Sequence, residues 1–145
     1  MLFVGTFPYQ MDRNRVPIPP GFRAAFKAGG MVSTGTAPCL VLRTLEGFEE
    51  ASLGVKSLPD NEEGDEARRD FFANTHSIQK DGQGRVVLPL NLVDHAGLKG
   101  DVVVTGLGEA LEIWDRATWE ARDPQRKSTR LAVRNARAAS TAQGS

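Results

Sequence analysis

The apolar positions between residues 72 and 121 fall into short runs that are separated by turns. Residues 86–88, Val-Val-Leu, follow a glycine-rich turn, which is typical of a β-hairpin. Pro89 ends this run because proline lacks the N–H group that a strand ladder needs. Residues 101–105 and 110–114 are two more apolar runs, joined by Gly-Leu-Gly. The pattern predicts short strands paired as hairpins.

Two short helices are predicted between and after these strands. Residues 91–96 form the first, with Asn91 as the N-cap and Gly97 as the stop signal. Asp115 is the predicted N-cap of a second helix, which contains Trp119. This half of the chain therefore indicates an α+β fold that is mainly β, with short helices.

The first half of the chain repeats this order of elements. At an offset of 70 residues, Arg15 matches Arg85 and Pro19 matches Pro89. Offsets that drift by one residue place small insertions in the loops, as expected when strands are retained and loops vary. The chain therefore contains one unit twice. Further matched pairs are Phe3 with Phe72, Thr6 with Thr75, Asp12 with Asp81, Leu40 with Leu111 and Leu42 with Ile113.

Two longer helices, at residues 46–57 and 62–73, are predicted to connect the two halves, with an interruption at Leu58-Pro59-Asp60. The composition then changes near residue 124 to Arg, Ala, Ser and Thr, which predicts a mobile or loosely helical end. We expect four segments: a first unit at 1–50, an acidic helical linker at 51–71, a second unit at 72–121 and a basic, flexible tail at 122–145.

The charge of the chain is balanced overall but uneven along its length. Its 18 Lys and Arg residues equal its 18 Asp and Glu residues, which at first argues against a nucleic-acid partner. By segment, however, the formal charge is +4 for residues 1–43, −6 for 44–72, −3 for 73–121 and +5 for 122–145. Such a pattern can present a basic face to DNA, or it can simply reflect solvated helix faces.

Other chemistry is weakly represented. Cys39 is the single cysteine and lies in an apolar run, so it indicates a small buried residue and no disulfide. With only His76 and His95 besides it, the chain lacks the clustered ligands of a zinc site and the residues of a nucleophile-and-base set. We therefore expect no cofactor, no metal and no enzymatic activity. The sequence also shows neither a signal peptide nor a membrane span, which predicts a cytoplasmic protein.

The candidate chemistry lies in two equivalent turns, MDRNR at 11–15 and KDGQGR at 80–85. In the second turn, Asp81 can accept backbone N–H groups, and its glycines permit close approach of the backbone to another molecule. Arg85 could then present its planar fork of donors to phosphate oxygens or to the edge of guanine. The alternative is that Asp81 and Arg85 only pair with each other across a surface turn.

Beyond these patterns, the chain resembles the MraZ family from Phe3 to about Arg122. The resemblance rests on VGTFPYQMDRNRVPIPPGFR, on CLVL before Phe48, on HSIQKDGQGRVVLPLNLVDHAGL and on LEIWDRATW. It implies tandem duplicated swapped-hairpin units of the SpoVT-AbrB type that form a pseudo-two-fold β-barrel with linking helices. It also implies a homo-oligomeric ring that binds short direct repeats in double-stranded DNA upstream of its own operon, in the division and cell-wall gene cluster.

The first turn departs from the family pattern, because Asp12 and Arg15 are one residue closer together than Asp81 and Arg85. Asn14 replaces the usual glycine, and Asn tolerates the left-handed conformation better than most residues. Counting back from Arg15 would instead place Met11 at the aspartate position. The candidate DNA contacts are Arg13, Asn14, Arg15, Lys80, Gln83 and Arg85, and the turn-forming residues are Asp12, Asp81, Gly82 and Gly84.

Together with this resemblance, the sequence predicts a transcriptional regulator that represses its target genes and is associated with the nucleoid. We expect it to act as a homo-oligomer and to have no membrane partner. The shortened turn and the basic tail leave a second hypothesis open. In it, the same fold serves as an antitoxin-like or protein-interaction module, and DNA binding is secondary or lost. The tail itself either adds phosphate affinity or is a solubilising end.

Overall fold

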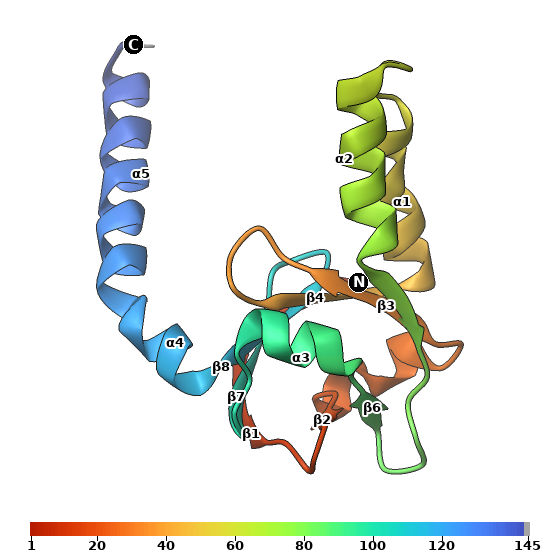
Figure 1. Ribbon diagram of the computed structural model, residues 1–145. Coiled ribbons are helices and arrows are strands. Elements are labelled where there is room, and N and C mark those ends of the chain that lie inside the picture. The colour runs from red at the N-terminus through yellow and green to blue at the C-terminus, as the bar shows by residue number, and fades with distance from the viewer. Residues whose placement is uncertain (144–145) are drawn as a thin grey trace.

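The computed structural model describes residues 1–143, which form an α+β fold with eight strands. Six strands make one antiparallel sheet, and the remaining two, β2 (Arg15–Pro17) and β6 (Arg85–Val87), pair separately (Figure 1). The α+β prediction is therefore confirmed. The main sheet, in spatial order, contains β1 (Thr6–Gln10), β7 (Asp101–Gly106), β8 (Leu111–Asp115), β4 (Leu40–Thr44), β3 (Gly30–Thr34) and β5 (Thr75–Ile78).

The two halves of the chain exchange strands within this architecture. β1 pairs with β7 of the second half, and β5 pairs with β3 of the first half. β2 and β6 likewise join the two halves in a ladder that places Val16 opposite Val86. The sheet stays open between its edge strands β1 and β5, so the expected barrel is not closed. From each edge strand the chain turns into β2 or β6, and these two pair with each other instead of with an edge.

Matched positions of the two halves meet in one hydrophobic core. Ile18 and Leu88 are both buried, and so are Leu40 and Leu111. Pro19 and Pro89 also match, because each lies two residues after its short strand, at the N-cap of the helix that follows. Those helices are the 3-10 helix η1 (Pro20–Phe26) and α3 (Leu90–Ala96).

The helix α3 begins one residue earlier than predicted, and the expected cap is wrong. Pro89 occupies the N-cap position without a side-chain hydrogen bond, and its carbonyl accepts from the N–H groups of Leu92 and Val93. Proline is favoured beside the first turn because its fixed φ suits entry into a helix. The predicted stop is confirmed, since Gly97 has φ +62°.

An acidic helical hairpin projects from the sheet (Figure 1). It consists of α1 (Leu45–Lys56) and α2 (Glu62–Ala73), each within one residue of the predicted bounds. The side chains of Thr44 and Asn61 cap the two helices by accepting from Gly47 N and Gly64 N at 3.0 and 2.8 Å. The rings of Phe48 and Phe71 stack at 5.4 Å and hold the helices together.

The chain ends in two helices, α4 (Arg116–Ala121) and α5 (Asp123–Gln143). Asp115 takes the predicted N-cap position of α4, but its carboxylate accepts from Lys99 N at 3.1 Å instead of capping the helix. α5 extends away from the sheet, on the side opposite the acidic hairpin (Figure 1). The predicted tail is thus helical as far as Gln143, and residues 144 and 145 lie outside the described residues. None of the helices in residues 1–143 combines the length and the apolar character needed to cross a membrane.

Candidate nucleic-acid interface

The two predicted turns lie side by side at one end of the molecule (Figure 1). The β1–β2 turn and the β5–β6 turn are brought together because β2 and β6 form their own antiparallel ladder. Arg15 pairs with Val87 in this ladder, and Pro17 pairs with Arg85. Segments 70 residues apart in sequence therefore present a single surface.

A pair of matching hydrogen bonds relates the two turns. The carbonyl of Asn14 accepts from Leu88 N at 2.8 Å, and the carbonyl of Gly84 accepts from Ile18 N at 2.8 Å. Asn14 and Gly84 therefore occupy equivalent places, as the offset of 70 indicates. In addition, the side-chain Nδ2 of Asn14 donates to the Leu88 carbonyl at 2.8 Å, a bond that glycine could not make.

Both turns begin at an aspartate. In the first, Asp12 and Arg15 exchange backbone hydrogen bonds at 3.0 and 3.1 Å, which closes a turn with two residues at its tip. In the second, Asp81 N donates to the Arg85 carbonyl at 2.8 Å and closes a longer turn. The structure thus places Asp12, and not Met11, at the position equivalent to Asp81.

The second turn is braced by the Asp81 carboxylate. Its Oδ1 accepts from the backbone N–H groups of Arg85 and Gln83 at 3.0 and 2.8 Å. The bond from Arg85 N contributes most to holding the pKa of Asp81 below its usual range, and the Gln83 N–H and the Arg85 guanidinium add to it. Gly84 follows with φ +76°, and a Cβ atom there would collide with the Arg23 side chain. This position therefore requires glycine.

The first turn adopts a strained conformation. Arg13 has φ +61°, in the left-handed region that costs a non-glycine residue about 1–2 kcal/mol. From the sequence we expected Asn14 to adopt the left-handed conformation, and this is wrong, because its neighbour Arg13 adopts it. Two hydrogen bonds to Leu88 hold Asn14 in place, so the chain reverses its direction at Arg13.

The guanidinium of Arg85 connects the two turns. Its Nε donates to Oδ2 of Asp81 and its Nη1 donates to Oδ2 of Asp12, both at 3.1 Å. The pairing of Asp81 with Arg85 that the sequence left open is therefore present, and it includes a second carboxylate from the other half of the chain. Whether Arg85 also contacts DNA stays a prediction.

The remaining candidates are free to bind. The side chains of Arg13, Arg15 and Gln83 are exposed and that of Lys80 is half-buried, and none of them makes a hydrogen bond or ion pair within residues 1–143. Gly82, at the tip of the second turn, is also exposed. These groups can meet an external partner without first breaking an internal contact.

Sequence reasoning missed Arg23 as a member of this site. Its Nε donates to the Ile18 carbonyl at 2.9 Å, and its guanidinium lies against Gly84. Arg23 belongs to the first half of the chain, so this contact fixes the second turn to that half. It also adds one more positive charge to the surface formed by the two turns. The only signal in the sequence was the charge of +4 over residues 1–43, to which Arg23 contributes.

The residues considered for other chemistry lie apart. Cys39 is buried, its thiol donates to Oε2 of Glu112 at 3.4 Å, and burial together with that carboxylate raises its pKa to about 12. His76 lies in β5 and His95 in α3. Within the part of the chain that the structure describes, no three His, Cys, Asp or Glu side chains gather to hold a metal ion.

Comparisons with known proteins agree on one family. The family model described as "MraZ protein, putative antitoxin-like" matches residues 71–140. A protein of Acetivibrio thermocellus named "Transcriptional regulator MraZ" is 33% identical over 122 residues, which cover 83% of this chain and 85% of the relative.

Two further relatives with the same name extend this agreement. The protein of Dehalococcoides mccartyi is 34% identical over 125 residues, covering 83% of this chain and 87% of the relative. That of Salinispora arenicola is 34% identical over 122 residues, covering 83% and 86%. At this identity over most of both chains, the protein described here belongs to the MraZ family.

Proposed function

We propose that the protein is a DNA-binding transcriptional regulator, and a repressor, whose two adjacent turns form the DNA-contacting surface. The observation that carries the proposal is the arrangement of charge at these turns. Arg85 pairs with the carboxylates of both Asp12 and Asp81, which leaves a formal charge of −1 on these three residues. Arg13, Arg15 and Lys80 make no ion pair within residues 1–143, so they outweigh that charge and leave the two turns basic. The relatives named transcriptional regulators support the same function.

The turns supply both kinds of contact that sequence-specific binding needs. Lys80 can neutralise a phosphate and fix the register of the protein on the duplex. Arg13 or Arg15 can donate in a fork to guanine, the commonest specific contact in the major groove, and Gln83 can pair with adenine in the same way. Asn14 is held by Leu88, so in this proposal its main contribution is the shape of the turn.

One subunit offers few phosphate contacts and carries no net charge, so it binds DNA weakly in this proposal. A homo-oligomeric ring presents this surface many times, so that successive subunits bind successive direct repeats. Once one subunit is bound, the next is held close to its own repeat, and this high effective concentration raises the overall affinity. In this proposal the repeats lie upstream of the protein's own operon in the division and cell-wall cluster, as the family resemblance implies. Binding there would make the protein nucleoid-associated.

The decisive experiment measures affinity for DNA upstream of the protein's own gene by fluorescence anisotropy across a salt series. We expect Arg13→Ala and Arg15→Ala each to weaken binding about tenfold or more and to lower the salt slope by about 1. Arg69→Ala is the matched control, because Arg69 is an exposed base of α2, in the hairpin that projects away from the turns (Figure 1). Wild-type affinity in both turn variants would overturn the assignment of this surface.

The second candidate is an antitoxin-like or protein-interaction module. The printed description of the matching family model, which includes the word antitoxin, favours keeping it in the test. Co-purification of a stoichiometric partner, together with no salt-dependent affinity for any upstream fragment, would replace the first proposal with this one.

A further inference from the structure

The C-terminal helix α5 is exposed over almost its whole length. From Lys127 to Ala142 every side chain is solvent-exposed, and near the start of the helix the Arg126 guanidinium lies 3.7 Å from the centre of the Trp119 ring. Most of the stability of a helix in a protein comes from packing and not from intrinsic propensity. Contact with a partner would therefore stabilise α5.

The exposed part of α5 is a cationic stripe with apolar borders. Arg130, Arg134 and Arg137 recur at helical spacing and share one face, and they make no hydrogen bond or ion pair within the described residues. Leu131 and Val133 flank this face, with exposed fractions of 48% and 47%. By contrast, the earlier bases of the helix, Arg126 and Lys127, are already paired with Asp123.

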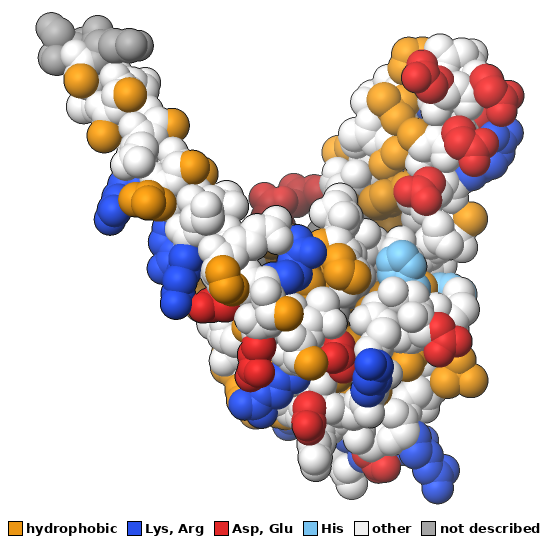
Figure 2. Space-filling view, turned by 60° about the vertical axis from the view of Figure 1, so that its left-hand side comes forward, with side chains coloured by type: hydrophobic (Ala, Val, Ile, Leu, Met, Phe, Trp, Pro, Cys, Tyr) orange, Lys and Arg blue, Asp and Glu red, His pale blue; other side chains and the backbone are white. Residues whose placement is uncertain are grey.

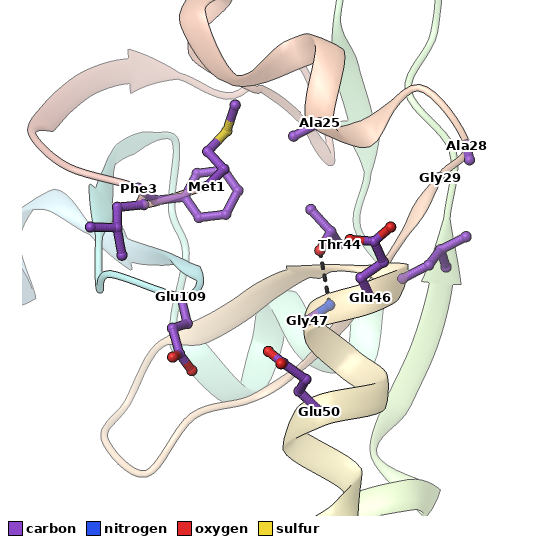
Figure 3. Close-up of a pocket in the computed structure, with 12 residues that line it drawn as sticks. Met1, Phe3, Ala25, Ala28, Gly29, Thr44, Glu46, Gly47, Glu50 and Glu109 are labelled. Atoms are coloured by element: carbon purple, nitrogen blue, oxygen red, sulfur yellow. Dashed lines mark hydrogen bonds between the residues drawn. The ribbon is translucent and has the colours of Figure 1, made fainter.

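The opposite side of the molecule carries a surface of the complementary kind. A hollow of about 760 Å³ lies between the N-terminal segment and the start of α1, and Figure 3 shows the side chains of Glu46, Glu50 and Glu109 around it. A second hollow of about 620 Å³ continues along α1 and shares Met1, Glu46 and Glu50 with the first. Together they form a groove, called here the α1 groove.

The α1 groove is apolar inside and mainly acidic at its rim, where Lys56 at the end of α1 is also among the lining residues. Leu45 and Leu53 are exposed within it at 39% and 62%. The rim carboxylates of Glu46, Glu49 and Glu50 make no ion pair within residues 1–143. Elsewhere on the hairpin the acids are partly satisfied, since Arg68 and Arg69 of α2 pair with neighbouring carboxylates. Figure 2 shows red acidic groups over the hairpin, next to blue bases, and blue bases along the part of α5 nearer the sheet.

The two surfaces also match in spacing. Glu46 and Glu50 are four residues apart on α1, as Arg130 and Arg134 are on α5, and each step spans about 6 Å along a helix. Each helix also carries an exposed leucine near these charges, Leu53 on the same face as the glutamates and Leu131 at the edge of the arginine face. Within one molecule α5 and α1 project in the same direction from opposite ends of the sheet and stay apart, so the match is made between molecules (Figure 1).

We propose that α5 of one copy docks in the α1 groove of a second copy of this chain, with Arg130 and Arg134 against Glu46 and Glu50. The contact joins two different surfaces, so after one contact the first copy keeps a free groove and the second keeps a free helix. Further copies can then add in the same way, and the assembly is a ring if the rotation between copies closes. The proposal rests on the homo-oligomer of the proposed function and names the surface that builds it.

Charge reversal tests the contact in the full-length chain. Arg130→Glu/Arg134→Glu, or Glu46→Arg/Glu50→Arg, sets like charges against each other, and we expect self-association to weaken about 100-fold or more. The chain with all four changes restores the opposite charges and regains the assembly. Sedimentation velocity without DNA measures the size of the oligomer, and circular dichroism confirms that each variant is folded.

Lys27→Glu/Lys99→Glu is the matched control, because it changes the net charge by the same amount at exposed bases outside α5 and the groove. An unchanged oligomer in both two-site reversals would overturn the proposal, whatever the protein's affinity for DNA. An intact oligomer with lost DNA affinity in Arg130→Glu/Arg134→Glu would overturn it in favour of a nucleic-acid role for α5. If the wild type assembled normally but bound no upstream DNA, the proposed function would be wrong and the proposed contact between copies would stand.

Discussion

The two turns of the interface occupy equivalent places but are stabilised in different ways. The second turn has a brace of its own, the Asp81 carboxylate on its backbone and glycine at the position with φ +76°, besides its contacts with Ile18 and Arg23 of the first half. In the first turn no aspartate side chain accepts from the turn's own backbone within residues 1–143, and Arg13 lies at φ +61°. The shape of this turn depends on the bonds from Asn14 to Leu88 in the other half of the chain. A duplicated unit can therefore lose its internal brace where its twin supplies contacts across the ladder.

The largest difference between the turns is expected at the equivalent positions Gly84 and Asn14. Gly84→Ala introduces a Cβ atom against Arg23 and an unfavourable φ, and we expect it to lower the free energy of unfolding by about 2 kcal/mol or more. Asn14→Ala removes one side-chain hydrogen bond and costs about 1 kcal/mol. Urea denaturation of both variants measures the two values. Equal losses would show that the second turn is no more constrained than the first.

The sequence predicts the elements of this site better than their contacts. Asp81, its glycines and the apolar run after them define a hairpin from local residues alone, and the structure contains β6 there. The link from Arg85 to Asp12 joins residues 73 positions apart, and no local pattern can indicate it. The same holds for Arg23 against Gly84, because the path of η1 depends on packing against the core.

Strand pairing and helix direction also lie beyond local patterns. The repeat predicts two equal units, but the exchange of β1 and β5 between the halves and the open edge of the sheet follow from long-range pairing. The composition of the tail indicates a solvated segment, and alanine with arginine also favours a helix. Its projection away from the sheet is visible only in three dimensions (Figure 1).

A smaller effect of opposite sign is expected at Arg13. Arg13→Gly removes the strain of the left-handed conformation, but glycine also makes the unfolded chain more flexible, which offsets part of the gain. We expect the free energy of unfolding to rise by about 0.5–1 kcal/mol. The same change removes an unpaired cation, so DNA affinity should fall about tenfold. Urea denaturation and anisotropy measure the two effects separately. A variant that loses stability would show that the first turn holds Arg13 without strain.

The smallest effect is expected on acidification, at the brace of the second turn. The pKa of Asp81 is lowered in the folded chain, chiefly because Arg85 N donates to the carboxylate, so this brace is present at neutral pH. It is lost as the pH falls below about 4 and through the lowered pKa, because protonation removes the favoured acceptor. The backbone amide resonances of Gln83 and Arg85 report this transition by NMR. Asp81→Asn keeps an acceptor oxygen that does not titrate, so the shift should vanish in that variant while the turn persists. If both resonances moved equally in the variant, the carboxylate would not be the group that braces the turn.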